Sequence, residues 1–233
     1  MNENSLFLLV AQYLSVAYVV ISGLITVLYF FCIKLNYLQD RRISDLFFIL
    51  MAISFVNSLI IEVINEIFPH DPGKYTIIVN LYNLYELVIY GIFFYRILEN
   101  LKERKATKYI FSIFLITNVL NYFFYEGIMV FNSLALSLNC IVYITFAILY
   151  FRQILQNPVT LHLEKYPIFW LVAAIFFYHS ASLFISLFQK FIYLGYFAAS
   201  FPIWNLYNIF VILYELLIGY ALLLWIPHKT SPS

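Results

Sequence analysis

The stretch NLYNLYELVIYGIFF, residues 80–94, decides the fold class, because most of its residues are apolar although it contains one carboxylate. With its neighbours it approaches the roughly 20 apolar residues that a helix needs to cross a bilayer. Glu86 lies near the middle of the stretch, and Asn83 and Asn80 precede it by about one and two helical turns. This pattern predicts a membrane-spanning helix whose polar side chains face other helices rather than lipid.

The composition of the whole chain agrees with this prediction. Of its 233 residues 64% are hydrophobic and 11% are charged, and the mean hydropathy is +0.89. A soluble domain of this size could not bury so much apolar surface, so we expect an integral membrane protein with membrane lipid as its surroundings. The net charge of +1 provides no field that would attract nucleic acid, so we expect no nucleic-acid partner.

Seven segments are long and apolar enough to be spanning helices. We therefore predict an all-α, seven-transmembrane-helix bundle that forms a single domain over residues 1–233. Proline-containing connections at 69–74 and 157–167 separate some of the segments. The predicted spans are 8–33, 45–67, 76–97, 108–125, 131–152, 167–189 and 203–226.

The basic residues predict the orientation of the bundle. Eleven of the thirteen Lys and Arg residues fall in the first, third and fifth connections and the C-terminal tail, and only Lys74 and Lys190 fall on the other side. Short loops rich in Lys and Arg stay in the cytoplasm, so the N-terminus is predicted outside and the C-terminus inside. We expect a multi-pass protein of a bacterial cytoplasmic (inner) membrane, with no loop large enough to form a soluble domain.

Three ionisable residues fall at the middle of predicted spans: Glu86, His179 and Glu215. A charge at the bilayer centre costs roughly 3 kcal/mol, so such groups should face the bundle interior, pair or be protonated. One interpretation is a ligand pocket or proton relay formed by these residues together with Asn83, Asn208 and Ser182. The other is that neutral carboxyl groups only hydrogen-bond neighbouring helices. The sequence leaves both open, and for the asparagines alone it favours packing.

A further acidic pattern lies at the end of the second predicted span. Glu62, Glu66 and His70 are spaced i, i+4, i+8, so their side chains could share a face and hold a cation. Pro69 interrupts the helix before His70, which favours a solvated acidic helix end instead. We predict no other metal or cofactor site, and we expect Cys32 and Cys140 to be small core residues.

Two tetrapeptides occur twice in the chain. NLYN is found at 80–83 and 205–208, and LYEL at 84–87 and 213–216. The four-residue difference in offset is about one helical turn, so each pair could keep the same face. Two parallel three-helix units, as in some sugar transporters, would produce such an internal sequence repeat. The prolines, however, all lie at span boundaries or in the tail, so we favour coincidence or a shared packing demand.

Three stretches resemble a group of small, largely uncharacterised bacterial seven-helix membrane proteins. They are LYNLYELVIYGIFFYRIL at 81–98, KYPIFWLVAAIFFYHSASLFIS at 165–186 and WNLYNIFVILYELLIGYALLLW at 204–225. The resemblance implies a sensor-like companion of a membrane histidine kinase. Because the chain has no kinase or output domain of its own, the resemblance also implies a separate signalling partner.

The functional hypothesis is therefore a non-enzymatic sensor or receptor-like subunit. It would bind a small or lipidic ligand near Glu86, His179 and Glu215 and relay helix movement to its partner. The alternative is a small proton-coupled transporter that uses the same residues. A third possibility is an intramembrane enzyme, although the sequence identifies no pair of nucleophile and base.

Overall fold

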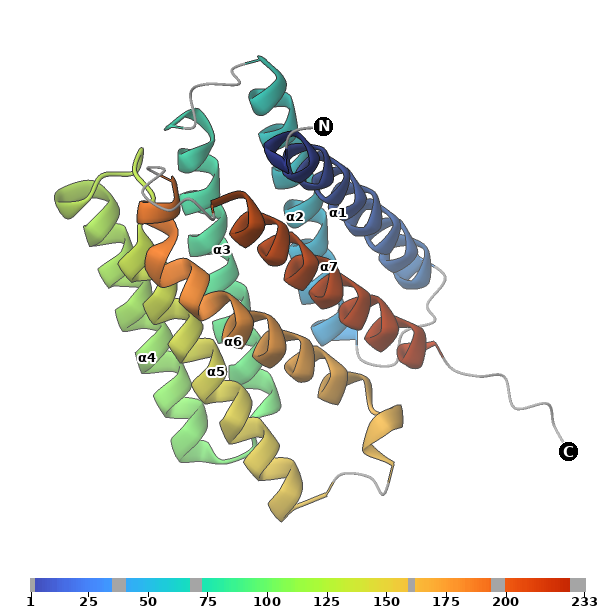
Figure 1. The fold of residues 1–233 in the computed structure, drawn as a ribbon. Coiled ribbons are helices and arrows are strands. Elements are labelled where there is room, and N and C mark those ends of the chain that lie inside the picture. The colour runs from blue at the N-terminus through green and yellow to red at the C-terminus, as the bar shows by residue number, and fades with distance from the viewer. Residues whose placement is uncertain (1–2, 35–40, 68–72, 159–161, 194–199, 227–233) are drawn as a thin grey trace, which may run out of the picture.

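The computed structural model describes residues 3–34, 41–67, 73–158, 162–193 and 200–226, and over these residues it is entirely helical (Figure 1). A π-helical turn, Asn121–Tyr125, follows the fourth helix, and a 3-10 turn, Leu163–Lys165, precedes the sixth. The long helices are α1 (Glu3–Lys34), α2 (Arg41–Ile67), α3 (Gly73–Ile97), α4 (Leu101–Leu120), α5 (Ser133–Gln156), α6 (Pro167–Tyr193) and α7 (Ser200–Trp225).

Each predicted span falls on one of these helices, which confirms the all-α class. Within the described residues, the six helices other than α4 are long and apolar enough to cross a membrane. Helix α4 differs because it begins at Leu101 rather than at residue 108, so its first turns include the charged run Lys102–Lys105. Only its second half is apolar, and the π-helical turn extends that half to Tyr125.

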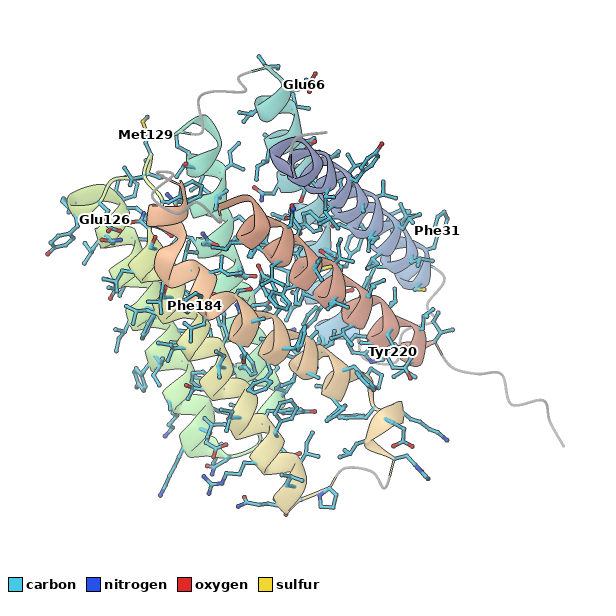
Figure 2. All side chains as sticks on the ribbon, in the orientation of Figure 1. Phe31, Glu66, Glu126, Met129, Phe184 and Tyr220 are labelled. Carbon is cyan, nitrogen blue, oxygen red and sulfur yellow. The ribbon has the colours of Figure 1, made fainter. Side chains whose placement is uncertain are left out.

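The helices alternate in direction along the chain (Figure 1), and their contacts close a ring. Helix α1 packs against both α2 and α7, and the ring continues through α2–α3, α3–α5, α5–α6 and α6–α7. Helix α4 lies outside the ring against α3 and α5. Alternation brings the start of α2, the end of α3 and the start of α4 to one end, which we call the basic end. The opposite, acidic end contains Glu66 and Glu126 (Figure 2).

The bundle buries many polar residues and exposes many large apolar ones. Large apolar side chains such as Leu24, Phe31 and Phe184 are exposed on its surface (Figure 2), whereas Ser22, Ser54, Asn80 and other polar residues are buried. In water this arrangement would leave an extensive apolar surface uncovered. In a bilayer lipid covers that surface, and small or polar residues hold the helices together.

The half of the bundle toward the basic end is tightly filled. Phe47 on α2 and Phe93 on α3 meet edge to face with ring centroids 5.0 Å apart, and both are fully buried. Alanine residues on α5, α6 and α7 are fully buried beside them, which lets the helices approach closely. Other fully buried residues are Leu50, Met51, Phe94, Leu171, Val172, Ile175, Ile218 and Leu222.

Asparagines tie the connection between α4 and α5 to the bundle at the acidic end. The side-chain amide of Asn80 donates to the carbonyl oxygens of Ile128 (2.8 Å) and Val130 (3.0 Å). Asn118 donates to Asn139 on α5 at 3.0 Å, and Asn121 donates to Asn132 at 2.8 Å. These asparagines have the packing role that the sequence favoured for them.

Gly127 provides the turn in this connection, with a φ of 88° in the left-handed region. No atom lies within 4 Å of a Cβ placed there, so backbone strain alone would oppose a side chain. We expect Gly127→Val to destabilise the protein by about 1–2 kcal/mol. Gly127→Asn should cost less, because asparagine tolerates this conformation. Thermal unfolding of both variants in the same detergent checks the order, and equal losses would contradict it.

Candidate functional site

A cavity of about 330 Å³ lies between α1, α2, α3, α6 and α7 in the half of the bundle toward the acidic end. Its volume is at the lower end of the range for small-molecule pockets, about 300–1,000 Å³. Its polar lining includes Ser15, Tyr18, Ser54, Asn57, Ser58, Glu62, Tyr82, Asn83, Glu86, Tyr178, Tyr207, Asn208, Tyr214 and Glu215.

Glu86 and Glu215 both line this cavity, with 7% and 1% of their surface exposed. Glu86 lies on the buried face of α3 one turn after Asn83, and Glu215 lies on α7 seven residues after Asn208. Spacings of three and seven residues keep side chains on one face of a helix. The second asparagine of each NLYN and the glutamate of each LYEL therefore line the same cavity.

The carboxyl group of Glu215 is buried without a hydrogen bond. Neither of its oxygens has a partner in hydrogen-bonding geometry among the described residues. The Ser22 hydroxyl lies next to the carboxyl group and also has no partner in such geometry. The amide nitrogen of Asn83 is likewise buried without a partner. Such groups are costly unless something outside the protein satisfies them. The cavity thus offers polar atoms that the protein itself leaves unused.

Tyrosines form the aromatic part of the lining, and their hydroxyl groups are tied within the protein. Tyr18 is hydrogen-bonded to Ser54 (2.9 Å), Tyr178 to Tyr207 (2.7 Å), and Tyr214 to the core residue Tyr90 (2.6 Å). These bonds hold the rings in place around the cavity. The Tyr90–Tyr214 bond also joins α3 to α7 directly beneath Glu86, one turn farther along α3.

His179 and Ser182 belong to a second, smaller cavity. This cavity of about 60 Å³ lies between α3, α5, α6 and α7. It adjoins the larger cavity, with which it shares Val79, Asn83, Glu86, Tyr178 and Tyr207. The three predicted ionisable residues are therefore divided between two adjoining cavities. Glu86 borders both cavities, Glu215 borders only the larger one, and His179 borders only the smaller one.

Aromatic rings enclose His179. Its ring centroid lies 4.5 Å from that of Tyr143, 4.8 Å from Tyr178 and 5.6 Å from Tyr90. Its Nδ1 atom contacts the Cys140 sulfur at 3.6 Å, whereas Nε2 has no partner among the described residues. A thiol beside an imidazole is a nucleophile–base pair that the sequence did not reveal. A 60 Å³ space, however, holds about two water molecules rather than a substrate.

The two acidic residues near the end of α2 lie in different surroundings. Glu62 is half-buried and lines the larger cavity, whereas Glu66 is exposed at the acidic end (Figure 2). His70 lies outside the described residues, so the predicted Glu62–Glu66–His70 cation site stays a prediction. Over the described part of the chain, no group of three or more His, Cys, Asp or Glu side chains could hold a metal ion.

Sequence reasoning missed the part of the cavity that α1 and α2 contribute. Tyr18, Ser54 and Ser58 carry no signal of their own in a chain with 21 tyrosines. Their helical spacing, Ser54–Ser58 and then Glu62, was the available indication, because it places three polar groups along one face of α2. Five of these tyrosines line the cavity: Tyr18, Tyr82, Tyr178, Tyr207 and Tyr214.

Comparison with known protein families, curated proteins and solved structures found no match to this chain. The assignment of function therefore rests on the residues of the two cavities.

Proposed function

We propose that this chain is a sensor or receptor-like subunit that binds a small ligand within its helical bundle. The observation that carries the proposal is the 330 Å³ cavity, into which Glu215 presents a buried carboxyl group with no partner among the described residues. Buried polar groups in proteins are usually hydrogen-bonded, and one that is not calls for an explanation such as a bound ligand, ion or water. Binding sites often contain groups that lower the stability of the ligand-free protein, and a buried carboxyl group without a partner would be one of them.

The chain spans the membrane seven times in this proposal. Helix α4 and its π-helical turn together cover residues 101–125. At 1.5 Å per residue this length is about 37 Å, which exceeds the roughly 30 Å hydrocarbon core. The charged first turns of α4 would lie at the headgroups, and its apolar second half would lie in the bilayer.

The N-terminus lies outside and the C-terminus inside, in a bacterial cytoplasmic membrane. Arg42, Arg96, Lys102, Arg152 and Lys165 are all at the basic end, and their clustering supports a cytoplasmic position for it. The acidic end would then face outward. The cavity lies in that outward half, so its ligand would enter from outside the cell or from the outer leaflet.

Cysteine labelling tests this orientation. In a chain lacking Cys32 and Cys140, Met129→Cys should react with a membrane-impermeant maleimide in intact cells, because Met129 is exposed at the acidic end (Figure 2). Lys105→Cys should react only after permeabilisation. The reverse pattern of labelling would show that the orientation is wrong.

The packing below the cavity favours a receptor over a transporter. A transported solute would have to pass Phe93, Phe47 and the other fully buried side chains that fill the half toward the basic end. In a receptor those same side chains would transmit movement of α3 and α7 from the cavity to the cytoplasm. A proton-coupled transporter remains the alternative, and it requires that this core opens in a second conformation.

The partner would be a membrane histidine kinase or another signalling protein that contacts the basic end. Arg104 is engaged there, since its Nε donates to the carbonyl oxygen of Tyr95 at 3.1 Å and its guanidinium lies 4.7 Å from the Tyr95 ring centroid. Lys102, Lys105 and Lys108 stay exposed. These lysines could meet anionic lipid or an acidic surface of the partner.

Filling the cavity tests the proposed function. Val211 lines the cavity on α7, so Val211→Trp should occupy it, and Leu216→Trp on the lipid-facing side of the same helix is the matched control. In a host that lacks the chromosomal copy, we expect Val211→Trp to reproduce the transcript profile of the deletion and Leu216→Trp to restore the wild-type profile. Full complementation by a correctly folded Val211→Trp protein would contradict the proposal.

Reconstitution separates the receptor from the transporter. A transporter moves its solute across vesicles that contain this chain alone, and Glu86→Gln or Glu215→Gln would uncouple it. A receptor shows binding without transport, and its signal requires the second protein. Solute accumulation by the purified chain would therefore favour the alternative.

A further inference from the structure

We propose that the ligand of the larger cavity is a protonated amine with an apolar body. This inference rests on the proposed function, because it names the ligand class of the same cavity. It draws on the charge of the lining, on the unpartnered polar atoms and on the tyrosine rings.

Three carboxyl groups line the cavity, and no basic side chain of the described residues lies beside them as a counterion. Glu62, Glu86 and Glu215 all border the cavity, whereas no Lys, Arg or His does so among the described residues. A carboxylate-containing or phosphorylated ligand would meet these groups at close range, which like-charge repulsion opposes. A cation would supply the missing counterion.

The unpartnered atoms favour a cation that can donate hydrogen bonds. Both oxygens of Glu215 are acceptors without donors in the described part of the chain, and this side chain is 1% exposed. An ammonium group has three N–H donors in a compact space and would satisfy them at once. Charge-assisted bonds of this kind are shorter and stronger than neutral ones.

The rest of the lining suits an organic body rather than a bare metal ion. Tyr82, Tyr178 and Tyr214 bring aromatic rings, and Val79 and Val211 bring aliphatic surface. The rings of Tyr178 and Tyr214 lie 4.9 Å apart and are fixed by their hydroxyl bonds. Aromatic rings attract organic cations and also bury apolar groups. A metal ion would need several oxygens at about 2.0–2.6 Å, and no group of three or more His, Cys, Asp or Glu side chains in the described part of the chain could hold one.

Three probes of similar shape test the inference: 2-phenylethylamine, 2-phenylethanol and 3-phenylpropanoate. The full chain, in nanodiscs of zwitterionic lipid at pH 7, is titrated with each probe by calorimetry and by thermal shift. We expect saturable binding and a rise in melting temperature with the amine only. Equal binding of the alcohol, preferential binding of the anion, or no binding of the amine would each overturn the inference.

Matched variants locate the binding. Glu215→Gln and Glu86→Gln keep the side-chain size and remove the charge, and each should weaken amine binding at least tenfold. Glu66→Gln removes an exposed carboxyl group outside the cavity and should leave amine binding unchanged. Unaltered amine binding in both cavity variants would refute the inference even if the amine binds the wild type.

These outcomes are distinct from failure of the proposed function. If Val211→Trp abolishes signalling but the amine does not bind, then the receptor stands and its ligand is of another class. If the amine binds but Val211→Trp complements fully, then the cavity binds amines without a signalling role.

Discussion

Replacing Glu215 with methionine should raise the thermal unfolding temperature of the protein. Both oxygens of this buried carboxyl group lack partners among the described residues, and an unsatisfied buried polar group costs about 1–3 kcal/mol. Methionine has a similar volume and no polar group to satisfy, and its flexible chain adapts to irregular space. For a chain of this length each kcal/mol corresponds to roughly 2–4 °C, so we expect a gain of about 2–12 °C.

The measurement is thermal unfolding of ligand-free wild type and Glu215→Met in the same detergent. Leu216→Met, at the lipid-facing neighbour on α7, is the control and should change little. If Glu215 were instead a structural residue that ties α7 to the bundle, its replacement would lower the unfolding temperature. A clear loss of stability would therefore contradict the interpretation of Glu215 as a binding group.

Replacing Asn80 with aspartate should have the opposite effect. The Asn80 amide nitrogen donates two hydrogen bonds to the connection after α4, and Asn80 is fully buried. Aspartate keeps the size but places oxygen against the carbonyl oxygens of Ile128 and Val130. Loss of both bonds together with repulsion at a buried position should cost about 3 kcal/mol.

Thermal unfolding measures this loss, and hydrogen exchange locates it. Amide exchange over residues 126–132 should accelerate in Asn80→Asp, because Asn80 holds that connection against α3. Asn208→Asp is the matched control, since Asn208 is half-buried at the larger cavity and should be nearly neutral. Similar losses at both asparagines, or unchanged exchange in the connection, would contradict the distinction between a packing and a lining asparagine.

The two asparagines also show how far sequence reasoning reached. Asn80 and Asn83 are three residues apart, and both lie on the buried face of α3, as their spacing predicted. Which of the two meets the carbonyl groups after α4 and which meets a cavity depends on the other segments of this chain that pack against α3. Periodicity identifies a face, but it carries no information about which element covers that face.

The boundary of α4 has a similar explanation. The sequence placed a span at 108–125 by its apolar content, and the helix in fact begins at Leu101. Asn100 caps it by accepting from the backbone N–H of Lys102 at 2.9 Å, so hydrogen bonding starts the helix before its apolar part begins. Hydropathy indicates which residues prefer lipid to water. A helix, however, extends as far as its backbone N–H and C=O groups find hydrogen-bond partners, so its ends need not coincide with those of the apolar segment.

What the sequence by itself determined is the all-helical class, the order of the helices and the inward faces of Glu86, Glu215 and His179. These follow from local composition and the 3.6-residue period, which act within one helix. Only the tertiary structure decided that Glu86 and Glu215 border one cavity while His179 is enclosed with Cys140 in another. That division depends on how far apart the helices stand and on which side chains fill the space between them, and no pattern within a single helix contains this distance.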